Sequence, residues 1–128
     1  MSKVGNVFLA SQYAIRYPLN PEGKGIMNLS FNPGNLRTEL QRHIGGLLRF
    51  IVHRLLLYPA VYGGYTELWA GWAEEAGRVG SNGGYVWPWG RFGGMREDVQ
   101  AEVEKGKTGE GKAVRFWEWC EKEAEAYQ

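Results

Sequence analysis

Apolar positions near the start of the chain recur at the spacing of one helix face. Val4, Val7 and Phe8 begin this pattern, which predicts a helix over 3–17. The next apolar run, 25–31, is short and is bounded by turn residues, so it predicts a strand. The chain is therefore expected to begin with a helix that leads into a strand.

The middle of the chain carries the patterns of two further helices. The segment 32–35 (Asn-Pro-Gly-Asn) is a strong turn signal. Thr38 and Gln41 then have the form of a capping box, which predicts a helix over 39–57. A second helix is predicted over 62–76. The apolar face of the first one is formed by Leu47, Leu48, Ile51, Val52 and Leu55.

The last third of the chain combines a short strand with one more helix. Tyr85, Val86 and Trp87 form an aromatic run between turn residues, which predicts a strand. We interpret 94–112, which is charged and glycine-spaced, as a partly mobile loop. An amphipathic helix is predicted over 114–127, and its inward side chains are Phe116, Trp117 and Cys120.

The order of these elements predicts an α/β layer. Helices that alternate with strands favour a parallel sheet, since parallel strands need a crossover connection. Two parallel strands alone would leave both edges exposed, so we interpret them as part of a larger sheet. The length of 128 residues suits one domain with a modest core.

Composition excludes several classes of protein. The formal net charge is +1 and both signs are scattered, so nothing favours a nucleic-acid partner. The single cysteine, Cys120, permits no internal disulfide and fits a reducing compartment. Residues 1–20 show no secretory signal, so a cytoplasmic location is expected. The 19 glycines occur beside six tryptophans and seven tyrosines, which is not the composition of a disordered chain.

Several motifs, in this order, resemble one known family. Residues 2–7 resemble the segment that carries its Tyr-x-x-x-Lys pair, and 32–38 resembles its Pro-Gly-x-x-x-Thr motif. Residues 82–91 and 117–120 resemble the terminal strand and last helix of its fungal branch. Over nearly its whole length, the chain resembles the C-terminal half of a short-chain dehydrogenase/reductase, similar to fungal alcohol or retinol dehydrogenases.

This resemblance implies a fold and an internal organisation. The fold would be α/β: an incomplete, C-terminal portion of a Rossmann-like, doubly wound parallel sheet. The whole of 1–128 would be a single partial domain. Its parts would be the helix of the Tyr-x-x-x-Lys motif (3–17), the strand and nicotinamide-side loop (25–38), the substrate lid and following helices (39–76) and the last strand with the C-terminal helix (82–128).

The resemblance also implies roles for individual residues. Lys3 would take the place of the family's lysine, which holds the nicotinamide ribose and lowers the pKa of the catalytic tyrosine. Pro33, Gly34, Leu36 and Thr38 would close over the nicotinamide of NAD or NADP. A purely structural interpretation remains open beside this one, in which Thr38 caps a helix and Lys3 is solvated.

Other parts of the family's machinery do not occur in the sequence. The matching tyrosine would stand two positions before Met1, and the catalytic serine would come from an earlier strand. There is no Gly-rich turn for the pyrophosphate, either G-x-x-x-G-x-G or G-x-G-x-x-G after a strand. We therefore expect part of an NAD(P)-dependent oxidoreductase for small or lipophilic alcohols or carbonyls, which alone is inactive and binds no cofactor. The alternative is a truncated, non-catalytic member that acts as a protein-interaction or dimerising module.

Three further features have open interpretations. The helix over 3–17 matches one that packs between subunits in the family, so a homo-oligomer is expected. The stretch 42–56 could lie on a membrane, although a substrate lid explains its apolar face more simply. The Trp87-Pro88-Trp89 cluster is interpreted as buried packing at a strand end, with an exposed binding platform as the alternative. His43 and His53 lack a ligand spacing, so no metal site is expected.

Overall fold

The computed structural model describes residues 2–39, 43 and 45–127. Five α-helices, one short 3₁₀ helix and three short strands lie within these residues. In chain order they are α1 (Ser2–Arg16), β1 (Ser30–Phe31), α2 (Gly46–Leu55), α3 (Val61–Trp72), η2 (Val79–Ser81), β2 (Tyr85–Trp87), β3 (Arg91–Phe92), α4 (Glu97–Lys107) and α5 (Gly111–Glu125).

The strands form one mixed sheet in the order β1-β2-β3. β1 and β2 are parallel, with Ser30 opposite Tyr85, as expected. β3 is antiparallel to β2, with Val86 opposite Phe92, so the prediction of a purely parallel sheet was wrong. The physical reason is a tight turn in which Trp89 and Gly90 have φ of 70° and 73°, which reverses the chain directly after β2.

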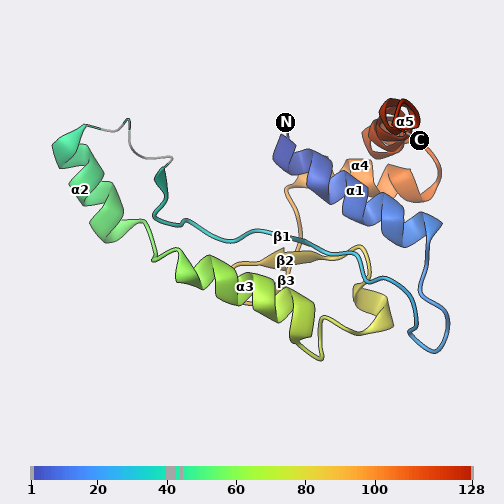
Figure 1. Ribbon diagram of the computed structural model, residues 1–128, viewed down its shortest axis with the longest axis horizontal. Helices are drawn as coiled ribbons and strands as arrows, with labels where there is room; N and C mark the ends of the chain where they lie inside the picture. Colours follow the sequence, from blue (N-terminus) through green and yellow to red (C-terminus); the bar gives the residue numbers. More distant parts are fainter. Residues whose placement is uncertain (1, 40–42, 44, 128) are drawn as a thin grey trace.

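Helices cover both faces of this small sheet. Figure 1 shows α1, α4 and α5 grouped on one side of the strands and α3 on the other, as expected for an α/β protein. α2 stands apart at the far end of the molecule, beyond α3. The fold thus has a packed region around α1, α4 and α5 and an extended region that ends in α2.

The main apolar core lies among α1, α4 and α5. Its buried residues are Val7 and Phe8 from α1, Val99 and Val103 from α4, and Ala113 from α5. The interpretation of 94–112 as a mobile loop was therefore wrong. The spacing of the two valines places them on one face of α4, and burial of that face stabilises a helix whose other side chains are mostly charged.

Several predicted boundaries also differ from the structure. The strand predicted over 25–31 is reduced to β1, because regular pairing to β2 begins only at Ser30. The helix predicted from 39 begins at Gly46, with Gly45 as N-cap and no side-chain cap. Gln41, the second half of the predicted capping box, lies outside the described residues. The helix predicted over 62–76 ends at Trp72.

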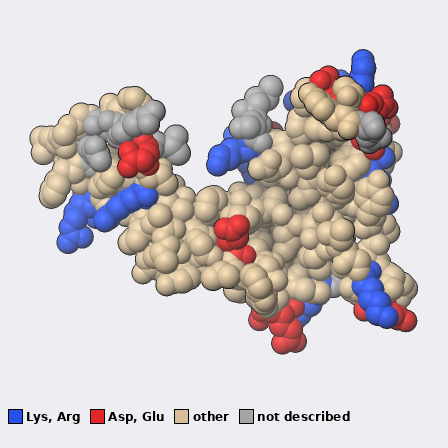
Figure 2. Space-filling view, in the orientation of Figure 1, with Lys and Arg blue, Asp and Glu red and all other residues tan. Residues whose placement is uncertain are grey.

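A large apolar surface remains outside the core. The exposed fractions of Leu47, Leu55 and Trp72 are 77%, 75% and 83%. Figure 2 shows that the middle of the molecule carries few charged side chains on this face, while charges gather toward its ends. Trp87 and Trp89 are 41% and 43% exposed, so the expectation that this cluster is buried was wrong.

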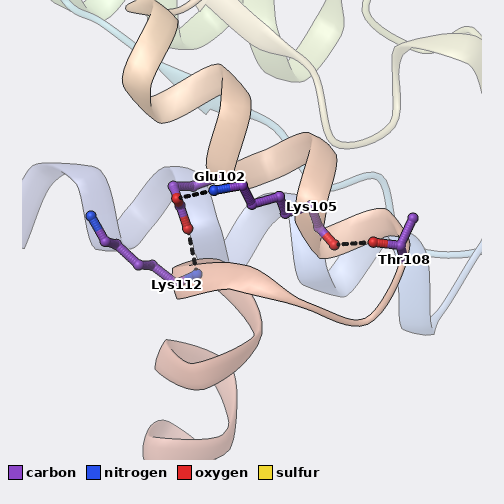
Figure 3. Close-up of polar contacts among 4 residues, drawn as sticks. All are labelled: Glu102, Lys105, Thr108 and Lys112. Carbon is purple, nitrogen blue, oxygen red and sulfur yellow. Dashed lines mark hydrogen bonds and ion pairs between the residues drawn. The ribbon is translucent and has the colours of Figure 1, made fainter.

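The connection between α4 and α5 is closed by polar contacts (Figure 3). The Glu102 carboxylate accepts a hydrogen bond of 2.6 Å from the backbone N–H of Lys112, in the first turn of α5, and pairs with Lys105 at 2.9 Å. The Thr108 hydroxyl donates to the Lys105 carbonyl at 2.8 Å. Glu102 therefore satisfies a free N–H at the start of the next helix, where no N-cap side chain does so.

Candidate functional site

A cavity of about 740 Å³ lies between α1 and the carboxyl end of β1. Lys3 lines it from the first turn of α1, and Pro33 and Gly34 line it from the loop that follows β1. The carboxyl ends of strands are where ligands bind in open α/β sheets. The structure thus brings together three of the five residues that the sequence singled out.

The loop after β1 is held in place by its own polar groups. The backbone N–H of Asn32 donates to the Val86 carbonyl at 2.9 Å, and the Asn32 side-chain oxygen accepts from the N–H of Gly34 at 2.9 Å. Gly34 has φ of 90°, and a Cβ there would lie 3.3 Å from Cβ of Pro88. A glycine is therefore required both by the backbone conformation and by the contact with the turn between β2 and β3.

Lys3 gives the cavity its charge. It is the only charged side chain among the described residues that line the cavity, and it makes no ion pair with any described residue. Arg96 lies near it and lines a smaller hollow of about 190 Å³ together with Lys3. Arg96 is bound to Asp98, and their hydrogen bonds lower the pKa of Asp98 and raise that of Arg96. Among the described residues that line these two hollows, Lys3 is therefore the cation without an ion-pair partner, and it can meet an anionic or hydroxyl-rich ligand.

The other two predicted residues lie outside this cavity. Leu36 forms a parallel β-bridge with Tyr58. The backbone N–H of Arg37 donates to the Tyr58 carbonyl at 2.8 Å, and the N–H of Tyr58 donates to the Asn35 carbonyl at 2.8 Å. The Leu36 side chain packs closely against Gly63 of α3. Thr38 is exposed at the end of the segment. The predicted cofactor-binding residues are therefore divided between the cavity and the connection to α3.

Four polar residues of the cavity were not singled out from the sequence. Asn6 and Tyr85 line the cavity from α1 and β2, and Ser30 and Asn32 line it from β1 and the loop. Asn6 stands three residues after Lys3, which places both on one helix face. Asn32 directly follows β1, at the carboxyl end of the strand, where ligands bind in open α/β sheets. These two spacings were the signals that could have identified them.

A second hollow, of about 810 Å³, lies between α3 and the strand region before and including β1. Met27, Leu29 and Phe31 line one side of it, and the C-terminal half of α3 lines the other. None of the five predicted site residues lines it. Its size alone does not make it a site, so the smaller cavity that contains Lys3 is the better candidate.

The described part of the chain carries no candidate metal site and no candidate membrane-spanning helix. Across 2–39, 43 and 45–127, three or more His, Cys, Asp or Glu side chains nowhere gather as metal ligands would. Within the same residues, every helix is too short or too polar to cross a bilayer.

Comparison with known proteins found relatives in fungi. The chain is 39% identical to a short-chain dehydrogenase/reductase of Phomopsis amygdali over 99% of its own length and 38% of the relative's. It is 41% identical to a short-chain dehydrogenase/reductase of Pestalotiopsis fici, over 94% of this chain and 35% of the relative. It is 37% identical to a short-chain dehydrogenase/reductase of Neocamarosporium betae, over 99% of this chain and 35% of the relative. No protein-family model and no solved structure matches the chain.

These matches agree with the motifs in the sequence and with the incomplete sheet. The chain spans little more than a third of the length of the curated relatives that it matches, while nearly all of the chain is matched. By sequence, the chain belongs to the short-chain dehydrogenase/reductase family.

Proposed function

We propose that the chain is the C-terminal part of an NAD(P)-dependent short-chain oxidoreductase that acts on an alcohol or a carbonyl compound. The observation that supports this is the cavity that joins Lys3 to Pro33 and Gly34. These residues come from separate elements, and both elements match the family's motifs around the nicotinamide. A cavity of this size is also in the range of cofactor and small-molecule sites.

The residues of the cavity fit one end of such a cofactor. The ammonium group of Lys3 is free to hold the ribose hydroxyls, and the loop at Pro33 and Gly34 would flank the nicotinamide. NAD or NADP would supply the hydride acceptor or donor. Leu36 and Thr38 would take part only if the segment after Gly34 moved toward the cavity.

The isolated chain is proposed to be inactive and to bind no cofactor. Neither Tyr13 nor Tyr17 lines the cavity. Tyr85 does line it, but it comes from β2 and not from the helix of Lys3, where the family's motif carries its tyrosine. The pyrophosphate has no Gly-rich turn to hold it. Titration of the chain with NADH and NADPH, followed by ligand fluorescence, should show no saturable binding. Micromolar affinity would contradict this part of the proposal.

A chimera tests the catalytic role. This chain would replace the matching segment of the Phomopsis amygdali relative, and NAD(P)H-dependent turnover would be measured. Activity of the chimera is expected, and Lys3→Ala should lower its kcat/KM by about 100-fold or more, in line with the loss of an acid–base group or of the residue that tunes it.

The matched control is Lys24→Ala, which removes an exposed lysine paired with Glu22 at 2.8 Å. It should leave turnover unchanged. A chimera that shows the relative's circular dichroism spectrum but has no activity would refute the proposed function. So would an active chimera that tolerates Lys3→Ala.

A dimerising module is the second candidate function, and the open edge of β1 favours it. The N–H groups of Ser30 and Asn32 donate to the carbonyls of Gly84 and Val86. The N–H groups of the alternate residues Leu29 and Phe31 therefore face the other way. A second chain could pair with this edge. Light scattering at increasing concentration should then detect a dimer that Phe31→Pro abolishes. A monomer at every concentration would exclude this candidate.

A further inference from the structure

We propose that the α2 arm, residues 45–58, is a docking surface for a bilayer that contains anionic lipid, with α2 lying along the interface. This inference does not depend on the proposed enzymatic function. It follows from the apolar face of α2, the charge of the segment around it and the position of the helix in the fold.

The apolar face of α2 is exposed. At 100° per residue, Leu47, Ile51, Leu55 and Leu48 fall on one arc of the helix. Their exposed fractions are 77%, 42%, 75% and 59%. Arg54 borders this arc, and Phe50, which is 67% exposed, lies on the far side of Arg54. Exposed apolar faces of this kind on a helix with basic flanks are typical of segments that lie in a lipid interface.

The α2 arm carries basic residues and no acidic residue. Within residues 45–58 the sequence carries two arginines, at 49 and 54, and no acidic residue. The rest of the chain has 13 basic and 14 acidic residues, because the whole chain has 15 and 14, so the net charge of the rest is −1. Figure 2 shows Lys or Arg side chains, together with one acidic side chain, at the end of the molecule that bears α2. The charge therefore complements anionic headgroups at the place where the apolar face is exposed.

The position of α2 at one end of the molecule would let the helix lie against a bilayer. Figure 1 shows the helix at one end of the molecule, away from the sheet and from the other helices. Its 10 residues extend about 15 Å, too short to cross a hydrocarbon core and suited to lying on it. A second copy of the chain is a poorer occupant, because two arms with the same excess of arginines would repel each other.

Sedimentation with vesicles tests this proposal. The chain would be mixed with vesicles of phosphatidylcholine alone, or with about a third phosphatidylserine, at low and at physiological salt. Binding to the anionic vesicles is expected, with weaker binding at higher salt and weaker binding to phosphatidylcholine alone. Equal binding to both compositions, or none to either, would overturn the proposal.

Variants of the arm identify the surface. Leu55→Asp should weaken partition into anionic vesicles by about 10-fold or more, because it places a charge on the face of α2 that would be buried in the lipid. Arg54→Gln should weaken it by about fivefold, the effect of one basic residue near an anionic surface. The controls are Ile26→Asp and Lys24→Gln, whose side chains are exposed outside the arm, and both should bind as the unmodified chain does.

The same variants separate lipid from protein partners. Circular dichroism should show that each variant keeps its fold, since the substituted side chains are exposed. If Ile26→Asp weakened vesicle binding as much as Leu55→Asp, the arm would not be the surface. If Leu55→Asp left vesicle binding unchanged but abolished self-association, the occupant would be a second copy and the proposal would be wrong.

Discussion

The helical unit of α1, α4 and α5 and the α2 arm both contain amphipathic helices, yet only the first buries its apolar face. In the helical unit, Val7, Val103 and Trp117 are 8%, 5% and 4% exposed. In the arm, Leu47 and Leu55 are more than two-thirds exposed. The number of apolar residues does not explain this difference, because the arm is the richer in leucine. It arises because the three helices of the unit face one another, while α2 faces no other helix (Figure 1).

The two regions differ in whether the chain itself supplies the packing partners of their apolar faces. The helical unit supplies its own partners, so its contacts should control the stability of the isolated protein. The arm can gain stability from its apolar face only through another molecule or another segment. Substitutions should therefore divide the molecule into a part that controls folding and a part that controls association.

The largest effect is expected at Trp117, in the helical unit. Its ring lies 4.6 Å from that of Tyr13, edge to face, and the Arg16 guanidinium lies 5.0 Å from its centroid. Trp117→Ala should lower the free energy of unfolding by about 3–5 kcal/mol, because it removes a buried aromatic ring and leaves a cavity. Urea denaturation measures this loss. A loss below about 1 kcal/mol would mean that α5 does not anchor the unit.

A smaller loss is expected where α4 approaches α1. A Cβ at Gly106 would lie 2.6 Å from the side-chain nitrogen of Gln12, which is 1% exposed, so the Gln12 side chain would have to shift inside the packed unit. Gly106→Ala should cost about 1–3 kcal/mol in urea denaturation. The control is Gly71→Ala in α3, where a Cβ meets nothing within 4 Å, and it should stabilise by about 0.5–1 kcal/mol. Equal responses at the two positions would contradict the close packing of α1 and α4.

The polar contact between α4 and α5 predicts a dependence on pH. The N–H of Lys112 and the ammonium group of Lys105 hold the pKa of Glu102 below its ordinary value of 4.5. A lowered pKa adds stability above the ordinary value, and this stability is lost as the pH falls through the folded-state pKa. The urea midpoint of the unmodified chain should therefore fall more between pH 6 and pH 3 than that of Glu102→Gln. Parallel curves would show that Glu102 does not cap α5.

The smallest effect is expected in the arm. Leu55→Ala should change the free energy of unfolding by less than about 0.5 kcal/mol, because the side chain is 75% exposed and leaves no cavity. The same substitution at a buried leucine costs about 2–5 kcal/mol. A cost in that range would show that the arm packs against the body of the isolated chain, and the comparison between the two regions would fail.

Periodicity in the sequence predicted the helical unit only in part. The patterns around Val7 and Trp117 located α1 and α5, because their apolar residues recur at helical spacing. α4 was missed because glycines and charges outnumber its apolar residues, although Val99 and Val103 are four residues apart. β3 was missed because two residues give no alternation to detect.

The sequence named five candidate site residues, and the structure brings three of them to one cavity. Lys3, Pro33 and Gly34 could be named because they fall within short motifs. Leu36 and Thr38 stand in the same motif, yet the backbone bridge to Tyr58 carries that segment away from the cavity. Such a bridge depends on a contact between distant residues, which no local pattern encodes.

The packing of α1 against α4 and α5 also has a consequence for the order in which the protein is made. α1 ends at Arg16, while α4 begins at Glu97, so the residues that cover Val7 and Phe8 are synthesised roughly 80 residues later. At a synthesis rate of about 5–20 residues per second, the apolar face of α1 stays without its packing partners for on the order of ten seconds. α4 and α5 can pair with each other as soon as both emerge, because they are neighbours in sequence. While α4 and α5 are not yet synthesised, the apolar face of α1 should therefore be open to chaperones, and α1 should dock once both helices have emerged.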